Sequence, residues 1–310
     1  MFSASNEGGR SSLNRVAVTD DGVRYEDGEL KLHDGRTLAW RWWGEPDGIP
    51  VLRLQGTPGC RLYRHPDPAV QRDLGVRYLL ADRPGYGGST RLPGRGVGVI
   101  AEDLAALLDH HKLDRVPVMG TSGGGPHALA VAAKHPDRIS AVTVIVGSSP
   151  LEPDEVSKLV GVNAAGYAAA ERGWEPLHEL LSQVRVRLLG DEGMAGVLSD
   201  APPEDRVIMQ NPAWQKISRA GMAEALKQGA EGWADESMAL HNGWDFDPAE
   251  IQATVTWWAG DDDKNVPLSA ARRASARVPE VDLRVFHKEG HFASLTHETE
   301  IVKDLLGRSA

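Results

Sequence analysis

Apolar and polar positions along this chain predict strands and helices that alternate. Short apolar runs, typical of buried strands, are followed by segments with the 3.6-residue apolar spacing of amphipathic helices. The expected strands are residues 29–33, 37–43, 50–54, 76–80, 116–119, 139–146, 253–258 and 281–286. The expected helices are residues 98–112, 126–135, 267–277 and 297–306. This order indicates an α/β fold, with a mostly parallel sheet covered by helices on both faces.

Three segments depart from the alternation. Asp34-Gly35 between the first two strands is a hairpin signal, which predicts an antiparallel edge. Residues 148–245 hold Ala-, Leu- and Glu-rich stretches broken by Gly and Pro, which predict a helical insertion. Residues 1–24 begin without the apolar stretch of a secretory signal and are expected to form a flexible tail. The core domain is therefore expected over residues 25–147 and 246–310.

Composition narrows the class of protein. With 310 residues, 41% hydrophobic and 25% charged, the chain can bury a large core and is neither disordered nor fibrous. The formal charge of −10 disfavours nucleic-acid binding, because phosphate backbones are also negative. No apolar run reaches the roughly 18 residues of a membrane span. Cys60 is the only cysteine, which excludes an intrachain disulfide and a multi-cysteine metal site. We expect a cytoplasmic protein that takes a small-molecule substrate, with homo-oligomer formation left open.

A serine at a glycine-rich turn is the strongest candidate for chemistry. Gly120-Thr121-Ser122-Gly123-Gly124 lies between an expected strand and an expected helix, and it matches G-x-S-x-G in the context of a nucleophile elbow. The outer glycines leave room where strand and helix approach closely, and the helix N-terminus favours negative charge beside the serine. The alternative is a turn that merely starts a helix. A phosphate-binding loop is excluded because no Lys-Ser or Lys-Thr follows.

A second glycine-rich turn, from Gln55 to Gly59, follows the strand at residues 50–54. Acyl transfer generates an oxyanion, which needs preorganised N–H donors. The candidate donors are the backbone N–H groups of Thr57 and Gly123. The alternative is an ordinary Pro-Gly turn.

Three adjacent carboxylates, Asp261, Asp262 and Asp263, follow the strand at residues 253–258. They lie at the carboxyl edge of the sheet, where α/β folds place ligand sites. A solvated acidic turn and a cation site are alternatives, although adjacent side chains diverge too much to favour a shared cation.

A histidine, His291, follows the last expected strand within Gly290-His291-Phe292 and can reach the same edge. His287 and His297 are rivals that are less free to point into a site. His287 abuts the strand end, and His297 starts a helix.

Together these motifs resemble the α/β-hydrolase superfamily over about residues 25–307. The segments that carry the resemblance are Gln55–Gly59, Asp82–Ser89, Gly120–Gly124, Gly260–Pro267 and Gly290–Phe292. The order Ser, Asp, His along the chain is that of the family's triad. The resemblance implies that Ser122 is the nucleophile, His291 the base and Asp263 the acid, because the family's acid is the third residue after the glycine.

The family also places a helical cap, or lid, where this chain has residues 148–245, and it implies no cofactor and no metal. One departure is Gln55, where many relatives have His. Glutamine can still form hydrogen bonds, so we expect a retuned oxyanion turn. The segment from Asp82 to Ser89 is interpreted as structural.

The implied function is hydrolysis of a small or mid-sized apolar carboxylic ester or lactone through an acyl-enzyme. Serine at position 122 argues against the dehalogenase and epoxide-hydrolase branches, which use aspartate there. The substrate-binding candidates are Gln55, Cys60, Tyr63, Trp174, Trp214, Trp233 and Trp244.

Three alternatives remain open. One is an aminopeptidase that resembles prolyl iminopeptidases, whose cap carboxylates would bind a free amine. The carboxylates available for that role are Glu204, Asp205, Glu231, Asp235 and Glu236. The others are a carbon–carbon bond hydrolase and a non-catalytic ligand-binding protein on a hydrolase fold, and an intact triad disfavours the latter.

Overall fold

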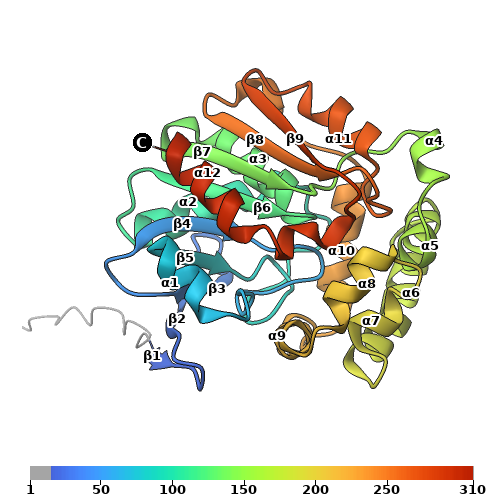
Figure 1. The fold of residues 1–310 in the computed structure, drawn as a ribbon, viewed down its shortest axis with the longest axis horizontal. Helices are drawn as coiled ribbons and strands as arrows, with labels where there is room; N and C mark the ends of the chain where they lie inside the picture. The colour runs from blue at the N-terminus through green and yellow to red at the C-terminus, as the bar shows by residue number, and fades with distance from the viewer. Residues whose placement is uncertain (1–14, 310) are drawn as a thin grey trace, which may run out of the picture.

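The computed structural model describes residues 15–309 and shows a central sheet with helices around it (Figure 1). The strands are β1 (Arg15–Val18), β2 (Arg24–Lys31), β3 (Thr37–Trp43), β4 (Ile49–Leu54), β5 (Val76–Ala81), β6 (Val116–Thr121), β7 (Ile139–Ile145), β8 (Thr254–Gly260) and β9 (Val281–Phe286). They form one sheet in the order β1-β2-β3-β5-β4-β6-β7-β8-β9. The three pairs from β1 to β5 are antiparallel, and the remaining pairs are parallel. The α/β fold with a mostly parallel sheet and an antiparallel edge is confirmed.

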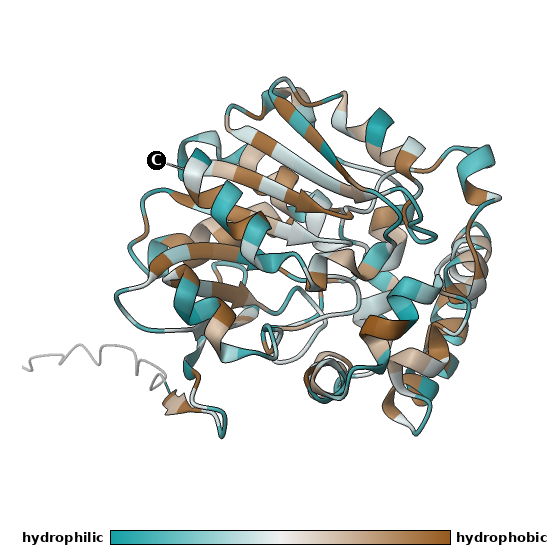
Figure 2. Ribbon diagram, in the orientation of Figure 1, coloured by the Kyte–Doolittle hydropathy of each residue, from teal (hydrophilic) through white to brown (hydrophobic). Residues whose placement is uncertain are grey.

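Helices cover both faces of the sheet. They are α1 (Pro68–Leu74), α2 (Ile100–His110), α3 (Gly124–Lys134), α11 (Leu268–Ser275) and α12 (Glu298–Arg308). Successive strand side chains point to opposite faces, so in β4 Leu52 packs in one core cluster with α2, α3 and α11, while Val51 packs in another with α1 and α12. In Figure 2 the strands are largely hydrophobic, whereas the helices around them combine hydrophobic and hydrophilic residues. Short 3₁₀ turns span Pro136–Arg138, Pro248–Glu250 and His291–Leu295.

The segment between β7 and β8 is helical, and we call residues 148–245 the helical insertion. Its helices are α4 (Pro153–Val156), α5 (Gly161–Ala170), α6 (Trp174–Leu189), α7 (Gly193–Val197), α8 (Pro203–Gln210), α9 (Pro212–Ala225) and α10 (Glu231–His241). Leu177, Leu181, Val184 and Leu188 recur along one face of α6 and are buried in a cluster that comes mainly from the insertion and also contains Cys60 and Tyr86. Helices α5 to α9 gather at one side of the sheet in Figure 1. The role of the insertion as a cap stays a prediction.

One strand and one α-helix outside the helical insertion were not expected from the sequence, and β2 begins at Arg24 where a strand was expected from residue 29. The tail expected over residues 1–24 is wrong for residues 15–24, because β1 pairs antiparallel with β2, from Arg15 opposite Asp27 to Val18 opposite Arg24, across a hydrogen-bonded turn at residues 19–23. Residues 1–14 lie outside the described part of the chain. Helix α1 was not expected: Asp67 accepts a hydrogen bond from the N–H of Ala69 at its start, and Gly75 ends it in the left-handed conformation. Within residues 15–309, no helix has the length and apolar character that crossing a membrane requires.

Candidate active site

Ser122 lies at the sharp turn between β6 and α3, at the carboxyl edge of the sheet. Its φ angle of 53° is in the left-handed region, which is strained for a serine. The turn is held by hydrogen bonds from the N–H of Ser122 to Ile145 O (2.8 Å) and from the N–H of Ser148 to Ser122 O (3.0 Å). A Cβ atom at Gly120 would lie 2.3 Å from Gly124 O, so the close approach of strand and helix requires glycine. The backbone therefore presents the serine hydroxyl at a fixed place.

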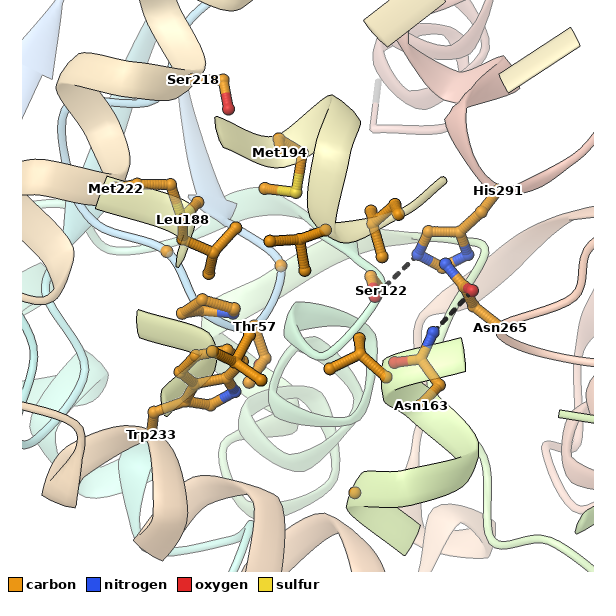
Figure 3. Close-up of a pocket in the computed structure, with 18 of the residues that line it drawn as sticks. Thr57, Ser122, Asn163, Leu188, Met194, Ser218, Met222, Trp233, Asn265 and His291 are labelled. Atoms are coloured by element: carbon orange, nitrogen blue, oxygen red, sulfur yellow. Dashed lines mark hydrogen bonds between the residues drawn. The ribbon is translucent and has the colours of Figure 1, made fainter. Parts of the chain in front are cut away.

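The structure brings Ser122, His291 and Asp263 into one hydrogen-bonded row. His291 Nε2 lies 3.0 Å from Ser122 Oγ (Figure 3), and His291 Nδ1 lies 2.8 Å from Asp263 Oδ2. The other oxygen, Asp263 Oδ1, accepts hydrogen bonds from the N–H groups of Asn265 (2.7 Å) and Val266 (2.9 Å). With its proton on Nδ1, a neutral His291 has a lone pair on Nε2 for the serine proton. The arrangement can therefore activate Ser122 as a nucleophile.

The pKa of His291 is set by two opposing effects. Burial of the ring lowers its pKa, but attraction to Asp263 and their hydrogen bond outweigh burial and leave the pKa of His291 raised. Asp205 of α8 contributes to the same attraction, and its carboxylate accepts the backbone N–H groups of His291 (2.9 Å) and Phe292 (2.8 Å). A Cβ atom at Gly290 would lie 2.4 Å from Asp205 Oδ2, so glycine makes this contact sterically feasible. From the sequence Asp205 was expected only as an amine ligand, because nothing along the chain links it to residues 290–292, which lie 85 or more positions away.

The rival acids and histidines have partners elsewhere. Asp261 accepts hydrogen bonds from the N–H of Lys288 (2.6 Å) and lies 3.0 Å from His287 Nδ1. Asp262 is exposed, and His297 Nε2 lies 3.0 Å from a carboxylate oxygen of Glu289. The three adjacent carboxylates thus face different partners, as expected from the divergence of neighbouring side chains.

The two candidate oxyanion donors lie side by side next to Ser122. A Cβ atom at Gly123 would lie 2.0 Å from Thr57 Oγ1, and one at Gly56 would lie 3.4 Å from Ser122 Cβ. Within residues 15–309, no hydrogen bond is formed by the backbone N–H of Thr57 or by that of Gly123. Gln55, the departure from the family pattern, is buried and donates from Nε2 to Ala81 O (3.0 Å), which ties the turn to the end of β5.

A cavity of about 530 Å³ opens at Ser122 and His291. Most of the residues that line it come from the helical insertion, and their apolar side chains include Leu181, Leu188, Met194, Met209, Met222 and Trp233. Figure 3 shows Leu188, Met194, Met222 and Trp233 on one side of Ser122, and Asn163 and Asn265 on the other. Asn163 Nδ2 donates to Asn265 Oδ1 (2.7 Å), which links α5 to the loop after β8.

Five of the seven expected substrate-binding residues line this cavity. They are Gln55, Cys60, Tyr63, Trp214 and Trp233. Burial raises the pKa of the Cys60 thiol, so Cys60 acts as a small apolar side chain.

The expectation is wrong for Trp174 and Trp244, which do not line the cavity. Trp174 donates from Nε1 to Asp235 Oδ1 (2.8 Å) and stacks on His178. Trp244 stacks on Phe246 against the sheet core.

The chain belongs to the α/β-hydrolase fold family, because the model of that family matches residues 49–298. It is 27% identical over 277 residues to the dihydrolipoyllysine-residue acetyltransferase component of an acetoin cleaving system from Pseudomonas putida, covering 88% of this chain and 66% of that protein. A proline iminopeptidase from Arabidopsis thaliana is 33% identical over 167 residues, 51% of this chain and 42% of that protein. A 2-hydroxy-6-oxononadienedioate/2-hydroxy-6-oxononatrienedioate hydrolase from Cupriavidus pinatubonensis is 26% identical over 318 residues, 95% of this chain and 99% of that protein.

Solved structures agree on the fold. An enol-lactonase from Burkholderia xenovorans matches with a TM-score of 0.66 and 18% identity, over 90% of this chain and 98% of that chain. An esterase from Thermogutta terrifontis matches with a TM-score of 0.63 and 20% identity, over 91% and 98% of the two chains. At these identities the likeness establishes the architecture and leaves the substrate open.

Proposed function

We propose that this protein is a serine hydrolase that cleaves a small or mid-sized apolar carboxylic ester or lactone through an acyl-enzyme. The observation that carries the proposal is the hydrogen-bonded row Ser122–His291–Asp263, which opens into an apolar cavity. The substrate class follows from the wall of that cavity and the reaction class from the row.

The reaction has two matched halves. Ser122 Oγ attacks the carbonyl carbon while His291 Nε2 takes its proton, and Asp263 holds the ring and stabilises its charged form. The oxyanion accepts hydrogen bonds from the N–H groups of Thr57 and Gly123. The C–O bond to the alcohol then breaks, and His291 returns the proton to the leaving oxygen. Water repeats the sequence on the acyl-enzyme and releases the acid.

The cavity favours an uncharged substrate. Its volume of about 530 Å³ lies within the range of roughly 300–1,000 Å³ that is usual for small-molecule sites. Among the residues that line it within the described chain, Arg219 is the only lysine or arginine, and it is exposed on α9. A substrate carboxylate would therefore enter the apolar interior without a buried cationic partner, which is costly.

The aminopeptidase alternative loses the five amine ligands expected for it. None of the five carboxylates proposed for that role lines the cavity. Asp205, Asp235 and Glu236 are buried, and each is bonded to groups of the protein. Glu204 is exposed, and Glu231 lies near His178 (3.7 Å). The carboxylates of the described chain that do line the cavity, Asp191 and Glu192, are exposed, and Glu192 is paired with Arg187 (2.9 Å).

A carbon–carbon bond hydrolase is the second candidate. It is favoured by relatives such as the 2-hydroxy-6-oxo-6-phenylhexa-2,4-dienoate hydrolase of Burkholderia cepacia, 29% identical over 266 residues. That name describes a carboxylate substrate, and within the described chain no buried lysine or arginine lines the cavity to pair with a carboxylate. A ligand-binding protein without turnover is disfavoured by the unbroken row of Ser122, His291 and Asp263.

Three chromogenic substrates separate these functions. We expect the protein to cleave p-nitrophenyl butyrate, and to leave prolyl-p-nitroanilide and 2-hydroxy-6-oxo-6-phenylhexa-2,4-dienoate uncleaved. Ser122→Ala is the blank, and its turnover should vanish. Faster cleavage of the anilide or of the dienoate would replace the ester proposal with the matching alternative. Tight binding of esters with no turnover by either protein would identify a receptor.

A further inference from the structure

We propose that Glu236, a carboxylate of the helical insertion, is a positioning residue that sets the oxyanion donor of Thr57 through Arg83 and through the Thr57 hydroxyl. The inference rests on the proposed function, because a positioned N–H matters only if Ser122 attacks a carbonyl group. It makes the insertion part of the catalytic apparatus as well as the wall of the cavity.

Glu236 reaches from α10 to the oxyanion turn. Its Oε2 accepts hydrogen bonds from Thr57 Oγ1 (2.9 Å) and Arg83 Nη2 (3.0 Å), and its Oε1 accepts one from Arg83 Nε (2.5 Å). The Glu236 and Arg83 side chains are completely buried. The hydroxyl of Thr57 donates to the carboxylate and also accepts from Arg83 Nη2 (3.2 Å), so its orientation is fixed on both sides.

Arg83 carries this contact into the backbone of the turn. Its Nη1 donates to Gln55 O (2.6 Å), and its Nη2 donates to Gly56 O (2.8 Å). The Gly56 carbonyl and the Thr57 N–H belong to one planar trans peptide group, so they point in opposite directions. Because Arg83 holds the carbonyl on its buried side, the N–H of Thr57 is turned the other way, toward the cavity.

Stability alone is a weak reason for this cluster. Arg95 Nη2 lies 3.2 Å and His127 Nε2 lies 2.9 Å from Glu236 Oε1, so four titratable groups share one buried site. Burial opposes the charge, but Arg83, His127 and Arg95 hold the pKa of Glu236 well below its ordinary range. A buried ion pair is often no more stabilising than apolar residues of the same size. A charged cluster placed under the oxyanion turn is better explained by the geometry that it imposes there.

The neighbouring residue provides a matched control. Asp235 is also on α10, also buried, and also bonded to an arginine from the loop after β5, with Arg91 Nε at 2.6 Å and Nη2 at 3.0 Å. It accepts a further bond from Trp174 Nε1 (2.8 Å) and, within residues 15–309, forms no hydrogen bond or ion pair with residues 55–57. Asp235 therefore shares with Glu236 its helix, its burial and its bond to an arginine, but it has no link to the oxyanion turn.

The test measures turnover of p-nitrophenyl butyrate, affinity for a butyl trifluoromethyl ketone and unfolding temperature in four variants. Loss of a whole oxyanion donor costs roughly 100- to 1000-fold in kcat, so for a misplaced donor we expect Glu236→Gln and Thr57→Val to lower kcat by about 10- to 100-fold. KM should stay within about two-fold, and the affinity for the ketone, whose adduct carries an oxyanion, should fall in step with kcat. Thr57→Ser should recover most of the loss. Asp235→Asn should lower the unfolding temperature and leave kcat within about two-fold.

The outcomes separate this inference from the proposed function. Thr57→Val leaves Glu236 with its contacts to Arg83, Arg95 and His127, so it remains informative if Glu236→Gln fails to fold. Wild-type kcat in Thr57→Val would overturn the positioning role and leave the hydrolase standing. A loss of kcat in Asp235→Asn equal to that in Glu236→Gln would also overturn it, because the effect would follow stability. Absence of turnover in the wild-type protein would instead overturn the proposed function.

Discussion

Replacing Asp263 by asparagine tests whether Asp263 determines which nitrogen of His291 carries the proton. Asp263 Oδ1 accepts two backbone N–H groups, from Asn265 and Val266, while Oδ2 accepts from His291 Nδ1. In Asp263→Asn the amide oxygen must take the place of Oδ1, because only an acceptor satisfies the two N–H donors. The NH₂ group then faces His291, whose ring must accept at Nδ1 and carry its proton on Nε2. That proton points at Ser122 Oγ, 3.0 Å away, so the ring can no longer accept the serine proton.

The expected loss is large and specific to activity. The same substitution in a serine protease triad lowers kcat about 10⁴-fold, which corresponds to about 5 kcal/mol of transition-state stabilisation. We expect a comparable fall in the steady-state hydrolysis of p-nitrophenyl butyrate at pH 8. The side chain keeps its size and its two backbone hydrogen bonds, so the unfolding temperature should move by only about 3 °C or less.

The adjacent carboxylate provides the control. Asp262 is exposed and lies 3.8 Å from Lys264 Nζ, a surface pair of little energetic consequence. Asp262→Asn should therefore keep wild-type kcat. Retention of more than about a tenth of the activity in Asp263→Asn, or an equal loss in Asp262→Asn, would refute the assignment of Asp263 as the triad acid.

Three further predictions follow from the packing and charge of the site. Only neutral His291 can accept the serine proton, and Asp263 raises the pKa of that ring above its ordinary value of about 6.5. We therefore expect kcat/KM to fall as the pH drops through a midpoint above 6.5. A profile that stays flat down to pH 4 would contradict this prediction. Gly120→Ala puts a Cβ atom 2.3 Å from Gly124 O and should lower the unfolding free energy by about 1–3 kcal/mol. In the control, Gly166→Ala on α5, the new Cβ atom meets no atom within 4 Å, so the unfolding free energy should rise by about 0.5–1 kcal/mol. Equal shifts of the two variants in urea unfolding would show that the turn at Ser122 is less tightly packed than the structure indicates. In the wild type, Nη1 and Nη2 of buried Arg53 donate to the Glu298 carboxylate at 2.7 and 2.9 Å. Glu298→Gln leaves the charge of Arg53 unpaired and should lower the unfolding free energy by about 3–5 kcal/mol in the same assay. An unchanged urea midpoint would rule out a stabilising role for this ion pair.

The hydrophobic pattern predicted the parts of the fold that are buried. Strands such as β7 and β8 are mostly apolar because both of their faces are covered by helices. Each chemical motif followed one of these strands, so Ser122, Asp263 and His291 were expected at a common edge, where the structure places them. The β1 strand carries no such signal, because Val16 and Val18 are 52% and 62% exposed. Asp67-Pro68 is a typical start of a helix, but the seven residues of α1 are too few to show a clear apolar period.

The lining of the cavity was only partly predictable. A tryptophan is apolar whichever way it points, and only the packing of the folded chain turns Trp233 toward the cavity and Trp244 toward the sheet core. Asn163 and Asn265 are 102 positions apart and become neighbours through folding alone. The same holds for Glu236, which in an acidic chain resembles a solvated carboxylate but is fully buried against Arg83.

The most direct test of the central claim is a rapid-mixing experiment with p-nitrophenyl butyrate, combined with mass spectrometry of the acid-quenched protein. An acyl-enzyme on Ser122 predicts a burst of p-nitrophenol that approaches one equivalent of protein when deacylation is slower than acylation. It also predicts a butyryl group on the peptide that contains Ser122, in the wild type and in none of the Ser122→Ala protein. A burst of p-nitrophenol with no acylated peptide, or a butyryl group on another residue, would contradict the account.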